Sequence, residues 1–129
     1  HDVAARLAVV PMVLEARGLD VTPATLERVR NLGDERGARI LERILDDEIR
    51  HVRFGSTHFA AWAETMNGEP ADLWKTLVSR HFGGAVKPPF NDSARLAAGL
   101  SRDFYLGVVC QQSIGITPTR ETAGGSDHL

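Results

Sequence analysis

Residues 34–68 read DERGARILERILDDEIRHVRFGSTHFAAWAETMNG, and their periodicity predicts one long helix over about 35–67. Asp34 suits the N-cap position, and Asn67-Gly68 is a pair that commonly ends a helix. One face is apolar at spacings of three and four, with Ile40, Leu41, Ile44, Leu45, Val52, Phe59, Trp62 and Met66. At 1.5 Å per residue the helix is roughly 50 Å long, a length typical of a helical bundle.

Two polar residues, Glu48 and His51, interrupt this apolar face. They are three residues apart, so their side chains leave the same side of the helix. An unpaired carboxylate inside an apolar face costs several kcal/mol, so Glu48 needs a partner. A divalent metal suits both a carboxylate and a neutral imidazole. An ion pair with a nearby arginine, or a buried hydrogen bond, also satisfies the spacing, and the spacing alone leaves these alternatives open.

A second inward carboxylate is expected from the first helix, which the pattern places at about 2–17, ending at Gly18. Pro11 predicts a local irregularity within it. Glu15 continues the apolar face formed by Ala4, Leu7, Ala8, Met12 and Leu14. A short helix within 19–33 can then bring Glu15 level with Glu48. One Glu on one helix and Glu-x-x-His on the next is half the ligand set of a four-helix di-metal protein.

The remaining pattern predicts further helices at about 71–81 and 93–100, and no segment alternates like a strand. The fold class is therefore expected to be all-α, with one domain over 1–106. Residues 107–129 are mostly polar or small, and we expect a disordered tail there. Because helical periodicity is already present at His1, we expect the chain to be a fragment that enters a helix partway along.

Composition excludes several classes of partner. The chain has 129 residues, 43% of them hydrophobic, and a formal net charge of −2. Nucleic-acid-binding domains usually carry a basic surface, so a nucleic-acid partner is not expected. No apolar run reaches the length of a membrane span. Cys110 is the single cysteine and can form no internal disulfide, which favours a cytoplasmic location.

Three separated segments resemble one known family. Residues 8–23 (AVVPMVLEARGLDVTP), 46–52 (DDEIRHV) and 88–95 (PPFNDSAR) are similar to the DUF455 family of ferritin-like proteins. This resemblance implies a ferritin-like helical bundle, of which the chain carries the last two core helices and the C-terminal helices. It also implies a two-metal centre of iron or manganese. Glu15 matches the lone glutamate of the third core helix, and Glu48 and His51 match the Glu-x-x-His of the fourth.

The chain departs from that family pattern because it lacks the two earlier helices that supply the other ligands. A complete centre would need a missing N-terminal half or a second copy in a homodimer, and the chain alone is expected to be inactive. The implied function is that of an oxidoreductase or oxygenase-type domain of unknown substrate. Two alternatives stay open: a non-catalytic helical scaffold with ion-paired Glu and His, and a relative of the tRNA-modifying hydroxylases.

Overall fold

The computed structural model describes residues 2–82 and 86–106, and all regular structure within them is helical. The elements are α1 (Val3–Val9), η1 (Val10–Glu15), α2 (Ala16–Asn31), α3 (Glu35–Thr65), α4 (Pro70–His81) and α5 (Asp92–Ala97), followed by a last helical turn at 102–106. The all-α prediction is confirmed. Cys110 and the tail predicted for 107–129 lie outside the described residues. No described helix has the length and apolar character needed to cross a membrane.

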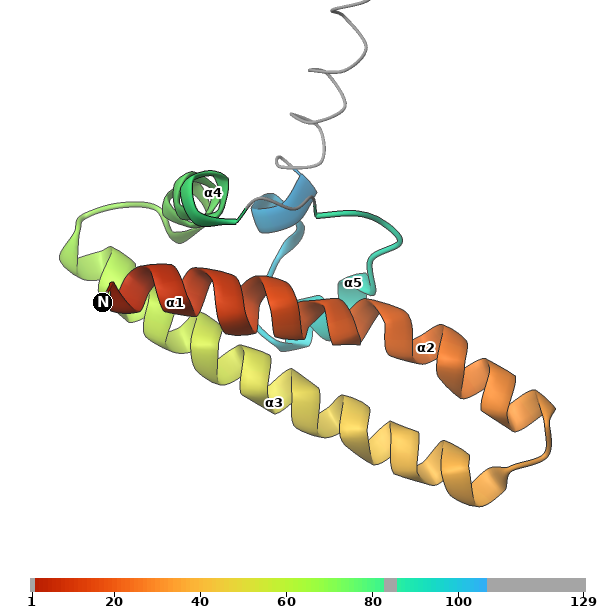
Figure 1. The fold of residues 1–129 in the computed structure, drawn as a ribbon. Helices are drawn as coiled ribbons and strands as arrows, with labels where there is room; N and C mark the ends of the chain where they lie inside the picture. Colours follow the sequence, from red (N-terminus) through yellow and green to blue (C-terminus); the bar gives the residue numbers. More distant parts are fainter. Residues whose placement is uncertain (1, 83–85, 107–129) are drawn as a thin grey trace, which may run out of the picture.

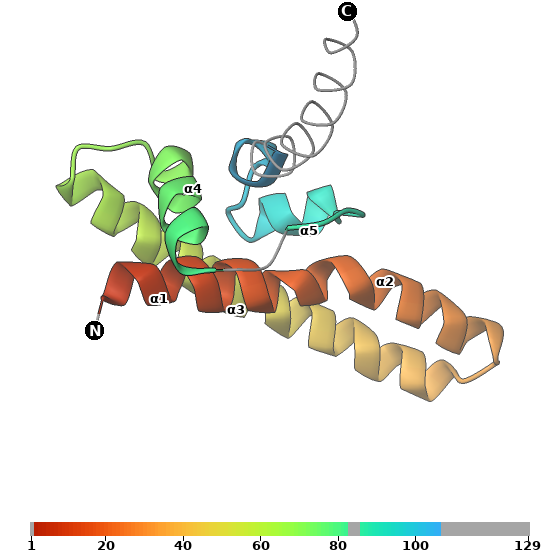
Figure 2. The ribbon, with the colours of Figure 1, turned by 45° about the horizontal axis from the view of Figure 1, so that its top comes forward.

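The fold is built on an antiparallel helical hairpin (Figure 1). α1, η1 and α2 follow one another as a single long helix, the chain reverses at Gly33 with φ of 83°, and α3 returns alongside. The Asp34 carboxylate accepts a hydrogen bond from the Gly37 N–H at 2.8 Å, which confirms the predicted N-cap. Figures 1 and 2 place α4 and α5 on the same side of this hairpin.

The predicted break at Gly18 and the separate short helix within 19–33 are wrong. The helix runs through Gly18 and Pro23 to Asn31. Pro23 has no N–H to donate to the Leu19 carbonyl one turn earlier. Asn91 Nδ2 donates to that carbonyl instead, at 3.0 Å, so the N-cap residue of α5 satisfies the group that proline leaves free. The chain therefore reverses only at Gly33.

The irregularity predicted at Pro11 is confirmed as a π-helical turn, η1. Five buried residues recur at intervals of four: Ala4, Ala8, Met12, Ala16 and Asp20. In a regular α-helix with 3.6 residues per turn this spacing would rotate by about 40° at each step. A π-turn closes an i→i+5 hydrogen bond and takes up one additional residue. η1 therefore allows α1 and α2 to bury the same side.

The apolar face predicted for the long helix divides into two rows. Val52 and Phe59 are fully buried against the core, whereas Ile40, Ile44 and Phe54 form a neighbouring exposed row; Met66, at the C-cap after Thr65, is exposed as well. α3 as a whole contacts α1, η1, α2, α4 and α5. The described residues leave the exposed row uncovered, so the prediction of one buried apolar face is wrong for Ile40 and Ile44, and Met66 is exposed because it lies at the end of the helix.

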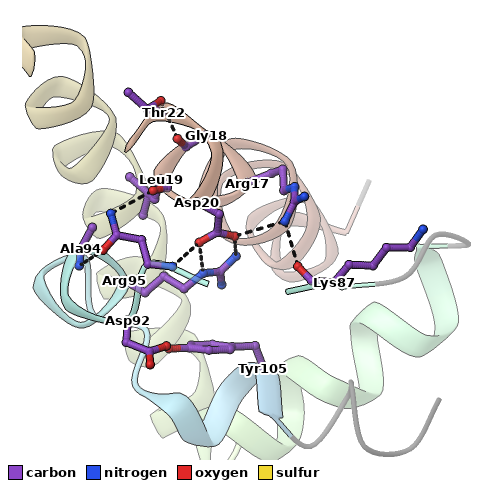
Figure 3. A network of polar contacts seen from close by, with 11 residues as sticks. Arg17, Gly18, Leu19, Asp20, Thr22, Lys87, Asp92, Ala94, Arg95 and Tyr105 are labelled. Carbon is purple, nitrogen blue, oxygen red and sulfur yellow. Dashed lines mark hydrogen bonds and ion pairs between the residues drawn. The ribbon is translucent and has the colours of Figure 1, made fainter. Parts of the chain in front are cut away.

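A buried ion pair joins residues 86–106 to the hairpin (Figure 3). Arg95 Nε and Nη2 donate to the two oxygens of Asp20 at 2.9 and 2.6 Å. The guanidinium carbon also lies 4.9 Å from the ring centre of Phe90 and 4.6 Å from that of Tyr105. The Asn91 N–H donates to Asp20 as well, at 2.9 Å. Because both charged groups are paired and hydrogen-bonded, their burial is tolerated.

Removing one partner of this ion pair should be costly. Asp20→Asn leaves the Arg95 guanidinium buried without a counter-charge, and we expect a loss of about 3–5 kcal/mol in the free energy of unfolding. Urea denaturation followed by circular dichroism measures it. Arg17→Ala is the control, since Arg17 is exposed and lies 3.7 Å from Asp20. Equal, small effects of the two substitutions would contradict the account.

Tyr105 reports directly on the same region. Burial, and then a hydrogen bond to Asp92 at 2.5 Å, raise its pKa from 10.0 to about 12. The neutral phenol is thus favoured by folding, and this stabilisation is complete below pH 10 and lost as the pH rises towards 12. Tyr105 is the single tyrosine, so ultraviolet absorbance of phenolate should titrate near pH 12. In Asp92→Asn the midpoint should fall. A midpoint near 10 in a chain still folded by circular dichroism would refute the assignment.

Candidate metal centre

Glu15, Glu48 and His51 come together where η1 passes α3. One ligand atom from each residue, a carboxylate oxygen or an imidazole nitrogen, lies within 4.8 Å of the others. Glu15 is the last residue of η1, and the other two are one turn apart on α3. Glu48 Oε1 and His51 Nδ1 are 3.5 Å apart. The three residues singled out in the sequence thus form one cluster drawn from two helices.

The register of the hairpin brings them level. Pro11 lies against Gly55, and Gly18 lies against the Glu48 side chain. Pro11 and Gly18 are seven residues apart, as are Gly55 and Glu48, so the two helices run antiparallel in step. Glu15 falls between these two contacts and faces the Glu48–His51 turn. The hairpin itself produces this alignment, and the returning short helix expected from the sequence is not needed.

The cluster is less enclosed than the sequence pattern predicts. The Glu48 side chain is 25% exposed and the His51 side chain 64% exposed. His51 belongs to the uncovered row of α3, between Ile44 and Phe54. The expectation of a fully apolar interior around all three residues is therefore wrong for the chain by itself. Water reaches the imidazole, and the site is open on one side.

The donor set matches a divalent cation of the first transition series. Carboxylate oxygen suits manganese, imidazole nitrogen suits iron, and both bind at about 2.0–2.2 Å. Two ligand atoms on one ion are then at most about 4.4 Å apart, so a small side-chain rotation within the 4.8 Å cluster places all three on one ion. In two-metal sites the ions usually lie about 3.5–4 Å apart, a distance similar to the spacing of these ligand atoms.

The competing explanation, an arginine paired with each glutamate, has no support in the described part of the chain. No Lys or Arg nitrogen of residues 2–82 and 86–106 forms a salt bridge, within 4.0 Å, with Glu15 or Glu48. Arg50, the nearest arginine in sequence, pairs with Asp47 instead. Within the described residues, the two carboxylates therefore lie beside each other and His51, and neither is paired with a lysine or an arginine.

His58 and Trp74 lie outside the cluster. His58 is exposed, with its ring centre 4.2 Å from that of Phe54, and Trp74 is buried in the core. Sequence patterns did not indicate the Asp20–Arg95 pair, which joins two of the family-like segments, 8–23 and 88–95. A lone aspartate two residues from a glycine carries no periodic signal, so only its contacts identify it.

Comparison with known proteins gives a family. The family described as "Protein of unknown function (DUF455)" matches residues 1–106. An uncharacterized protein of Haemophilus influenzae is 35% identical over 102 residues, which are 79% of this chain and 35% of that protein's length. No solved structure matches. The chain belongs to the DUF455 family, and it spans about a third of the length of this relative.

Proposed function

We propose that this DUF455-family chain supplies part of a two-metal carboxylate centre in a ferritin-like protein of the oxidoreductase type. The observation that carries the proposal is the convergence of Glu15, Glu48 and His51 from two antiparallel helices, where no lysine or arginine of residues 2–82 and 86–106 pairs with either glutamate. A glutamate on one helix and Glu-x-x-His on its neighbour is half the ligand set of the di-metal bundle proteins. The substrate stays undefined.

Each residue has a distinct role in this proposal. Glu15 and Glu48 provide anionic oxygens, which offset the charge of the ions and can bridge between them. His51 would provide a neutral nitrogen to one ion. Bound iron or manganese would supply the activation of dioxygen. With three ligands, the chain by itself holds an incomplete centre, and we expect no turnover from it in isolation.

Manganese binding tests the proposal. Mn²⁺ added to the purified 129-residue chain should lose its free-ion EPR signal in a saturable way, and Glu48→Ala and His51→Ala should each weaken binding at least about tenfold. The reason is that each variant removes one of three ligand atoms.

Two control substitutions for Mn²⁺ binding are available on α3. Glu64→Ala and His58→Ala change exposed residues of the same types away from the cluster and should bind Mn²⁺ like the native chain. If Glu48→Ala binds as tightly as Glu64→Ala, the cluster is not the metal site.

The remaining ligands require a partner on the uncovered row of α3. Ile40, Ile44, Glu48, His51 and Phe54 follow one another at spacings of four, four, three and three, so they share one face. Ile40, Ile44 and Phe54 are 54%, 49% and 66% exposed. In the longer relative, residues outside the matched part are available to cover such a face. In the isolated chain we propose that a second copy covers it, because exposed apolar patches favour association.

Self-association of the isolated chain is therefore expected. Light scattering after size exclusion should give a dimer or a larger oligomer, and Ile44→Lys should shift it towards monomer by placing a charge in the contact. Leu96→Lys is the control, because Leu96 is 64% exposed on α5, away from this row. If the native chain is a monodisperse monomer that unfolds cooperatively on heating, the proposed second copy on α3 is contradicted.

A further inference from the structure

The helices approach most closely at Pro11 and Gly55. A Cβ built on Gly55 would lie 2.6 Å from Pro11 Cβ and closer still to Pro11 Cγ. Ordinary contact begins near 3.4 Å, so a side chain at position 55 would require η1 and α3 to move apart by at least roughly 0.8 Å. Gly55 is buried and one turn beyond His51. The Pro11 ring therefore packs directly against the backbone of α3, the helix that carries Glu48 and His51.

Pro11 also shapes the helix that carries Glu15. It is the second residue of η1, and it has no N–H to donate to the Leu7 carbonyl four residues earlier. The turn widens, and the Ala16 N–H reaches back five residues to the Pro11 carbonyl. Glu15 lies inside this widened turn. Its position thus depends on the hydrogen-bond pattern that proline imposes.

The second contact of the pair is looser. A Cβ built on Gly18 would lie 3.6 Å from Glu48 Cγ, an ordinary van der Waals distance. An added methyl group at Gly55 must therefore displace a helix, whereas an added methyl group at Gly18 fits. These two glycines, one on each helix, lie on either side of the cluster.

We infer that Pro11 and Gly55 are positioning residues for the metal centre. The inference rests on the proposed function and deepens it. Metal sites hold their ligands within about 0.2 Å of the preferred distances. A separation of roughly 0.8 Å at Gly55 exceeds that tolerance several-fold and acts one turn from His51. The proline ring on Gly55 sets the helix separation, and the π-turn sets the direction of Glu15. Neither residue touches the ion.

Pro11→Ala separates positioning from stability. Alanine restores the missing N–H and favours regular helix by about 3 kcal/mol over proline. The variant should therefore keep or raise its helical content and thermal midpoint while its Mn²⁺ affinity falls at least about tenfold. A residue with a merely structural role would not lower affinity in a chain that is equally or more stable. Mn²⁺ affinity within threefold of the native chain would overturn the inference.

Gly55→Ala and Gly18→Ala form a matched pair. Both place a methyl group at the same interface, and only the first meets a steric conflict. Gly55→Ala should weaken Mn²⁺ binding at least about tenfold, and Gly18→Ala should change it less than twofold. If Gly55→Ala does not fold, Pro11→Ala decides the question. Equal affinities of the two glycine variants would overturn the role of Gly55.

The same titrations distinguish the two levels of the account. If the native chain binds Mn²⁺ and Glu48→Ala does not, but Pro11→Ala and Gly55→Ala bind normally, only the positioning inference fails. If the native chain binds no Mn²⁺, or Glu48→Ala binds as well as the native chain, the metal centre fails and the positioning inference is overturned with it.

Discussion

Two antiparallel helices can present ligands to one centre only if their backbones come close and stay in register. Here the approach is made where the ring of Pro11 lies on Gly55, and the register continues to Gly18 beneath Glu48. Glu15 stands between these contacts. The close approach is thus the constraint on which the cluster depends, because a wider separation would leave the carboxylates on separate, independently solvated surfaces.

The rest of the chain supports one side of this hairpin. α4 donates from Trp74 to the Ala8 carbonyl at 3.1 Å, next to the widened turn. The segment around Arg95 and Asn91 binds Asp20 and the Leu19 carbonyl on α2. Two prolines inside one long helix each leave a carbonyl without its usual donor, and the structure accommodates them differently. Pro11 produces a π-turn, whereas Pro23 is matched by a side chain from a distant segment.

Much of the architecture could be predicted from periodicity, caps and turn residues. Asp34, Asn67 and Gly68 mark α3 correctly, and Glu-x-x-His identified two of the three clustered residues, although His51 is exposed rather than inward. The π-turn was foreseen only as an irregularity at Pro11, since its geometry depends on packing against Gly55. The helix through Pro23 could not be predicted, because the hydrogen bond that permits it comes from Asn91, sixty-eight residues later. Periodicity also predicted one apolar face on α3 where the structure has a buried row and an exposed row. Ile44 and Val52 are both apolar, and only their burial distinguishes the two rows.

Anomalous diffraction at the manganese edge, from crystals of the Mn²⁺-loaded chain, tests the central claim most directly. The account predicts a peak within about 2.0–2.3 Å of a carboxylate oxygen of Glu15, one of Glu48 and a ring nitrogen of His51. A manganese peak elsewhere on the chain, with these three side chains turned towards water, would contradict it.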